Sequence, residues 1–72
     1  MFLELHRGGV PTLINFNTVS EVEESGEKAK LTFIQLADDG SDIWVLVDEP
    51  YHYVASEIKK YQKAMIPRSS II

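Results

Sequence analysis

One apolar run, DIWVLVD at residues 42–48, has no charged residue between its two aspartates. Alternate residues of a β-strand point to opposite faces of the sheet. As a strand, this run places Trp44 and Leu46 on the face opposite to Ile43, Val45 and Val47. A chain of 72 residues has little material with which to cover both faces. The run therefore requires either a strongly curled sheet or a second protein chain over its second face.

The chain has few other means of stabilising a small core. Its 72 residues form one domain, and a chain of this size buries only about 60% of its unfolded surface. The sequence contains no cysteine, which excludes disulfides and thiolate metal sites. Its two histidines, His6 and His52, are too few for a structural zinc site. We therefore predict no metal and no cofactor, and we expect a homo-oligomer, with a dimer favoured.

Charge and composition narrow the class of partner. The net charge is −4 and the isoelectric point is about 4.9. Phosphate contacts need a basic surface, so this balance disfavours nucleic acid as a partner. No stretch approaches the ~20 apolar residues of a membrane span, and the charged residues near the N-terminus do not fit a signal peptide. Together with the lack of cysteine, these features predict a cytoplasmic protein with no membrane contact.

Period-two patterns and turn residues predict five short strands. Gly8 and Gly9 mark a hairpin turn, because glycine reaches positive φ at no steric cost. Asp39 and Gly40 mark a second hairpin, and a single helical or bulged turn is expected near residues 16–19. The predicted strands cover about residues 2–7, 10–16, 19–24, 29–36 and 43–47.

A helix is predicted at about residues 50–65. Asp48 or Glu49 is placed to accept the free N–H groups of its first turn, and Pro50 suits an early helical position. One apolar stripe follows at helical spacing, formed by Tyr51, Val54, Ile58, Tyr61 and Met65. The expected fold is α+β and mainly β. A small, curled, barrel-like antiparallel sheet of about five strands precedes the C-terminal helix, in one domain at 1–66 with a tail at 67–72.

The order of these motifs resembles the small flagellar and swarming-motility proteins of the FlbD type. The matching positions run over about residues 2–60 and are Ile14–Asn15, Val19, Val22–Glu23, Asp39–Gly40, Leu46–Val47, Glu49 and Val54. The resemblance implies this fold, a role without enzymatic activity and a place in motility. The start MFLELHRGG, with five strands and a terminal helix, also resembles RNA-binding dimers of the carbon-storage-regulator type.

The second face of the apolar run carries the main functional prediction. Large exposed apolar patches usually mark an interface, and tryptophan is a favoured anchor. We expect a non-enzymatic protein-interaction module that self-associates through the candidate residues Trp44, Leu46, Ile34 and Leu36. The alternative is a nucleic-acid-binding regulator of the small β-dimer type, which would use a basic patch formed by Lys59, Lys60 and Lys63.

The remaining polar groups favour ordinary interpretations. Asp38, Asp39 and Asp42 could suggest a calcium loop, but the spacing lacks the full ligand set and favours a hydrophilic turn. His6 and His52 are interpreted as half-exposed histidines, and no catalytic residue is predicted. The acidic run Glu21, Glu23, Glu24 and Glu27 is interpreted as a solvated edge that discourages strand pairing.

Overall fold

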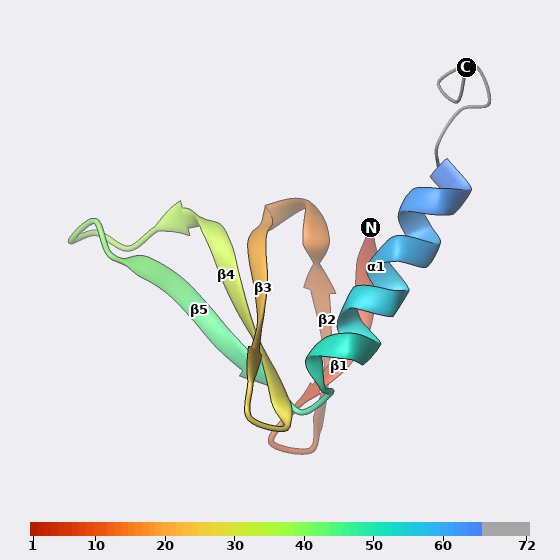
Figure 1. The fold of residues 1–72 in the computed structure, drawn as a ribbon. Helices are drawn as coiled ribbons and strands as arrows, with labels where there is room; N and C mark the ends of the chain where they lie inside the picture. The colour runs from red at the N-terminus through yellow and green to blue at the C-terminus, as the bar shows by residue number, and fades with distance from the viewer. Residues whose placement is uncertain (66–72) are drawn as a thin grey trace.

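A computed structural model describes residues 1–65, with their side chains through Gln62. Its elements are β1 (Phe2–Arg7), β2 (Val10–Asn15), η1 (Phe16–Thr18), β3 (Val19–Ser25), β4 (Lys28–Leu36), β5 (Asp42–Val47) and α1 (Tyr51–Met65). Figure 1 shows the five strands followed by the helix. The mainly β fold with one C-terminal helix is thereby confirmed, whereas the tail expected at 67–72 lies outside the described residues.

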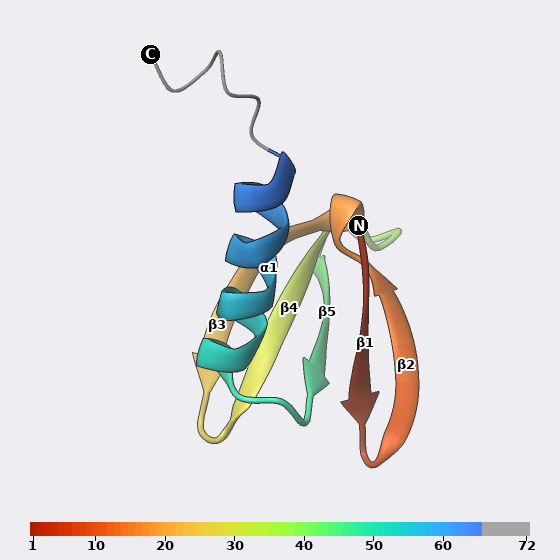
Figure 2. The same ribbon diagram turned by 90° about the vertical axis from the view of Figure 1, so that its right-hand side faces the viewer.

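The strands divide between two antiparallel sheets. β1 pairs with β2, and β3, β4 and β5 form a three-stranded sheet in that order. The sheets meet where the backbone N–H of Asp48 donates to the carbonyl oxygen of His6 at 2.7 Å. Figure 2 shows β5 as the strand of its sheet that lies nearest to β1. Over residues 1–65 the strands curl around a shared core without closing into a barrel.

A single 3₁₀ turn, η1, carries the chain from the first sheet to the second. The Asn15 side chain caps this turn by accepting a hydrogen bond from the N–H of Asn17 at 3.0 Å. The N–H of Phe16 donates to the carbonyl oxygen of Met1 at 2.8 Å, which ties the turn to the start of β1. The turn predicted near residues 16–19 is confirmed.

The core is enclosed by the first hairpin, the three-stranded sheet and the helix. Its buried side chains are Leu5, Ile14, Ala29, Leu31, Val47 and Val54. Burying each large aliphatic side chain contributes about 1.5–3 kcal/mol. The alternation in the sequence is confirmed at Leu31 and Val47, which face inward from β4 and β5.

The helix covers only the inner face of the three-stranded sheet. Val54 is fully buried and Ile58 is partly buried, but Tyr51 and Tyr61 are exposed. The apolar stripe expected along the whole helix therefore packs over only part of its length, against β3 and β4. The outer face of the sheet receives no cover from the helix (Figure 2).

The start of the helix differs from the sequence expectation. The carbonyl oxygen of Pro50 accepts from the N–H groups of Tyr53 and Val54, at 3.1 and 3.3 Å. The carboxylates of Asp48 and Glu49 instead accept hydrogen bonds from the first hairpin. The capping prediction is wrong because β1, at His6, and the turn after it, at Gly8 and Gly9, supply N–H donors next to these two carboxylates.

Candidate interaction surface

Trp44 and Leu46 lie on the outer face of β5, as the alternation predicts. In the register of β4 and β5, Trp44 faces Thr32 and Leu46 faces Lys30. The Lys30 ammonium lies 4.9 Å from the centroid of the Trp44 ring, in a cation–π contact. Trp44 is 50% exposed and Leu46 is 38% exposed. An aromatic and an aliphatic side chain therefore lie uncovered beside each other on this strand.

Ile34 and Leu36 lie farther along the same hairpin. Ile34 is 63% exposed and lies two residues after Thr32 on β4. Leu36 is 53% exposed and lies opposite Asp42 of β5. The register shifts between Thr32 and Leu36, and Figure 1 shows this end of the β4–β5 hairpin extending away from α1. The four predicted residues thus lie along one projecting hairpin rather than on one flat patch.

An open groove separates β5 from the first hairpin. Its volume is about 550 Å³, and its walls are Arg7, Gly8, Val10, Thr12, Trp44, Val45 and Leu46. A second hollow of about 240 Å³ shares Arg7, Thr12 and Val45, and it continues toward Leu13 and Phe33. The exposed side of the apolar run therefore borders a groove of mixed character, lined by apolar side chains together with Thr12 and one arginine.

Some residues of this surface were not predicted as part of the site. Val10 and Leu13 are 61% and 66% exposed and line the groove and the second hollow. Their contribution depends on how the two sheets face each other, which the local sequence pattern does not encode. Phe2 is exposed on the outer face of the first hairpin, while Phe16 packs against the core. Neither extends the surface around Trp44.

A polar cluster fixes the base of the groove. The carboxylate of Asp48 accepts from the N–H groups of Gly8 and Gly9, at 3.0 and 2.7 Å. Glu49 accepts from the backbone N–H of His6 at 2.9 Å and from its ring Nδ1 at 2.7 Å. We call this arrangement of five residues the carboxylate clamp. It joins the end of β5 to the end of β1 and to the first hairpin turn.

The electrostatics of the clamp favour its charged form. The hydrogen bond to Glu49 raises the pKa of His6 above its ordinary value of 6.5. Partial burial raises the pKa of Glu49, but the hydrogen bonds from the His6 ring and backbone outweigh it and hold that pKa below 4.5. The N–H groups of Gly9 and Gly8 lower the pKa of Asp48. Lys28 adds an ion pair to Asp48 at 3.5 Å.

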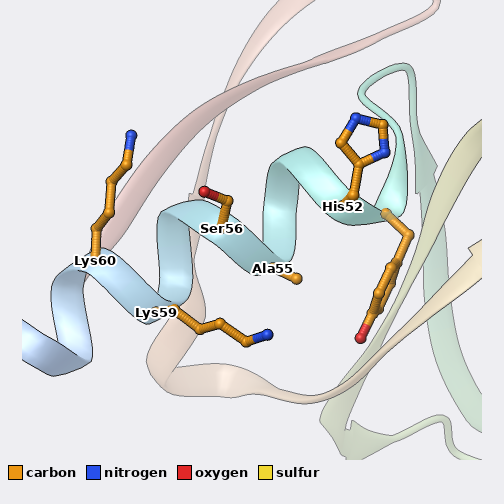
Figure 3. A pocket seen from close by; sticks show the side chains of 6 residues that line it. His52, Ala55, Ser56, Lys59 and Lys60 are labelled. Carbon is orange, nitrogen blue, oxygen red and sulfur yellow. The ribbon is translucent and has the colours of Figure 1, made fainter.

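Two lysines of the predicted basic patch, Lys59 and Lys60, lie in the part of the helix whose side chains are described. Lys59 and Lys60 line an open hollow with Tyr51, His52, Ala55 and Ser56. Figure 3 shows that the two lysine side chains extend to different sides of the helix. Lys60 lies 3.7 Å from a carboxylate oxygen of Glu57, and the side chain of Lys63 lies outside the described part. Lys59 and Lys60 do not form one continuous strip.

The turn between β4 and β5 has the geometry of a hydrophilic hairpin turn. Asp39 accepts hydrogen bonds from the N–H and the hydroxyl of Ser41, at 2.9 and 2.6 Å, and Gly40 has a φ of 85°. The carboxylate of Asp39 is thus used within the turn, as the sequence favours. Among residues 1–65, no three histidine or acidic side chains group as metal ligands would.

The fold and this surface define a small, mainly β protein with a projecting hairpin and one packed helix. Comparison with family models, curated proteins and solved structures returns no match. The resemblance to FlbD-type proteins therefore stays a prediction. Within the described chain, no helix has the length and apolar character needed to cross a membrane.

Proposed function

We propose that this chain is a non-enzymatic, cytoplasmic interaction module that self-associates through the outer surface of its β4–β5 hairpin. The single observation that supports this function is the exposure of large apolar side chains from Ile34 to Leu46. A role in motility, as the FlbD-type resemblance implies, would use the same surface to join a larger assembly.

The exposed apolar area is of the size that a small dimer needs. Five large apolar side chains lie on the outer face of the projecting hairpin or line the groove beside it, each 38–63% exposed: Val10, Ile34, Leu36, Trp44 and Leu46. With a full area of about 200 Å² for a large apolar side chain, they leave about 500 Å² in contact with water. A stable interface takes about 800 Å² from each partner, including its polar rim. Covering this surface with a second copy would also supply the stabilisation that a small chain without disulfides lacks.

The alternative of a nucleic-acid regulator has weaker support. A phosphate-binding surface needs several cations in one strip, while Lys59 and Lys60 extend to different sides of α1 (Figure 3). Lys60 is also paired with Glu57. A fluorescence-anisotropy titration with RNA at low salt would restore this alternative if it showed salt-sensitive binding.

The proposed function is tested by light scattering coupled to size exclusion on the wild type and on Trp44→Glu. We expect a wild-type dimer and, because a charge would be buried at an anchor position, an apparent dissociation constant raised about 30-fold or more in the variant. Tyr61→Glu is the matched control, because Tyr61 is a 40% exposed aromatic residue on the helix. A monomeric wild type, or a Trp44→Glu variant that dimerises like Tyr61→Glu, would contradict the proposal.

A further inference from the structure

The three-stranded sheet has two open edges, and they differ in how well they are protected. β3 and β5 are its outer strands. Exposed edges pair with other chains unless charges, prolines or bulges prevent it. β3 carries Glu21, Glu23 and Glu24, and its register with β4 shifts between Val19 and Glu21. Both features protect the β3 edge.

The β5 edge has less protection. Between Asp42 and Asp48 it has no charge and no proline. Its pairing with β4 is regular from Trp44 to Val47 and shifts between Trp44 and Asp42, where β4 carries the extra residues. Within the described residues, β1 lies beside the C-terminal end of β5, but the backbone hydrogen bond to the first hairpin is made at Asp48, after the strand has ended. The edge of β5 above this point borders the open groove.

We propose that two copies of this chain pair antiparallel through the free edge of β5, with Trp44 on the two-fold axis. This inference rests on the proposed function and adds the edge of β5 to it as the line of contact; Ile34 and Leu36 on the central strand β4 stay on the outer face of the joined sheet. In an antiparallel pair, the side chains of two directly opposite residues project from the same face of the sheet. An inward-facing residue of β5 must therefore lie opposite an inward-facing residue of the second copy, and an outward-facing residue opposite an outward-facing one. An isologous pair of this kind is closed, whereas pairing β5 with the acidic β3 of another copy would continue without end.

Several registers satisfy this condition, and the charged residues at the ends of β5 distinguish between them. With Val45 on the axis, Asp42 would face Asp48 of the second copy, and like charges directly opposite each other are destabilising. With Trp44 on the axis, Ile43 faces Val45 of the second copy and Asp42 faces Leu46 of the second copy. Shifting the axis to Ile43 places Ser41 opposite Val45 of the second copy and loses that apolar pair.

The groove offers a charge that complements this register. Arg7 lines the groove together with Leu46, and it forms no ion pair within the described residues. With Trp44 on the axis, Asp42 of the second copy lies opposite Leu46. Because Leu46 and Arg7 line the same groove, this places the carboxylate of Asp42 near Arg7. The exposed side chain of Val10, another wall of the groove, would be covered by the same strand.

Cysteine cross-linking tests this geometry directly, because the natural chain has no cysteine. Facing residues of an antiparallel pair have Cα atoms about 4.5–5.5 Å apart, within the range of a disulfide. Equal amounts of Ile43→Cys and Val45→Cys are mixed under mild oxidation. We expect a disulfide-linked heterodimer from the mixture and none from either variant alone, and none from Glu23→Cys on the β3 edge.

The outcomes separate this inference from the proposed function. Cross-linking of Val45→Cys with itself, or no heterodimer from protein that light scattering shows to be dimeric, would overturn the edge geometry and leave self-association intact. A monomeric wild type would overturn both. As a second measurement, Arg7→Glu is expected to raise the dimer dissociation constant about five- to tenfold at low salt, and an unchanged constant would contradict the position assigned to Asp42.

Discussion

The substitution Glu49→Ala gives a direct measure of how firmly the carboxylate clamp joins the two sheets. The Glu49 carboxylate accepts two hydrogen bonds from His6, one from the backbone and one from the ring. Its side chain is only 17% exposed, compared with 43% for His6. Truncation leaves the backbone N–H of His6 without its acceptor, in a position where the rest of the fold restricts access of water.

The expected loss is large for a domain of this size. A hydrogen bond to a charged group contributes about 1.5–3 kcal/mol. The bond from the His6 ring contributes less because the ring is exposed to water. We therefore expect the loss of both bonds to lower the free energy of unfolding by about 2 kcal/mol. Domains of this length have a total free energy of unfolding of about 4–10 kcal/mol. The corresponding fall in Tm is about 10 °C.

The loss should depend on pH in a defined direction. The folded state raises the pKa of His6, so the stability that its charge contributes is complete below about 6.5 and is lost as the pH rises through the folded value. The folded state lowers the pKa of Glu49, so its contribution is present above about 4.5 and is lost as the pH falls. Glu49→Ala should therefore be most damaging between these two values, near pH 5.5, and less damaging at pH 8.5.

Urea unfolding followed by far-UV circular dichroism measures these differences, with protein concentration held constant because association adds to apparent stability. Glu57→Ala is the matched control: its carboxylate pairs with Lys60 one helical turn away, and its removal should cost about 0.5 kcal/mol or less. The reasoning fails if Glu49→Ala is no more destabilising than Glu57→Ala. It also fails if the effect of Glu49→Ala is equal at pH 5.5 and pH 8.5.

Two further substitutions test the other half of the clamp and the packing of the helix. Asp48→Asn should speed amide hydrogen exchange at Gly8 and Gly9, measured by NMR, because their acceptor loses its charge; unchanged exchange would show that the turn does not need the carboxylate. Val54→Ala removes two methyl groups from a fully buried side chain and should lower the free energy of unfolding by about 2 kcal/mol. A loss below about 0.5 kcal/mol in thermal or urea unfolding would show that α1 is not firmly packed on the sheet.

Local patterns were sufficient to predict the elements and the faces of the strands. Alternation in β4 and β5 separated Leu31 and Val47, which are buried, from Trp44 and Leu46, which are exposed. This succeeds because the two-residue period of a strand is fixed by the backbone and does not depend on the rest of the fold. The outer face of β5 could therefore be named from the sequence alone.

The role of Asp48 and Glu49 could not be predicted in this way. Both precede a helix, and at such positions a carboxylate commonly caps the first turn. Their partners in the fold lie 39–43 residues earlier in the chain. Gly8 and Gly9 were predicted only as a turn, and nothing in the local sequence states where the free N–H groups of that turn will point. The division of the strands into two sheets was missed for the same reason, since it depends on contacts between distant segments.

The clamp and the open edge of β5 are two consequences of one junction. Asp48 follows the last residue of β5, and its backbone bond to His6 holds the two strands together at that level. Its carboxylate fixes Gly8 and Gly9, and so it also fixes the adjacent Arg7 at the wall of the groove. From Asp48 back toward Asp42, β5 separates from the first hairpin. The clamp therefore determines where the free edge of β5 begins, and it places the charge of Arg7 beside that edge. Weakening the clamp should therefore impair self-association as well as stability, although neither Asp48 nor Glu49 lies on the proposed two-fold axis.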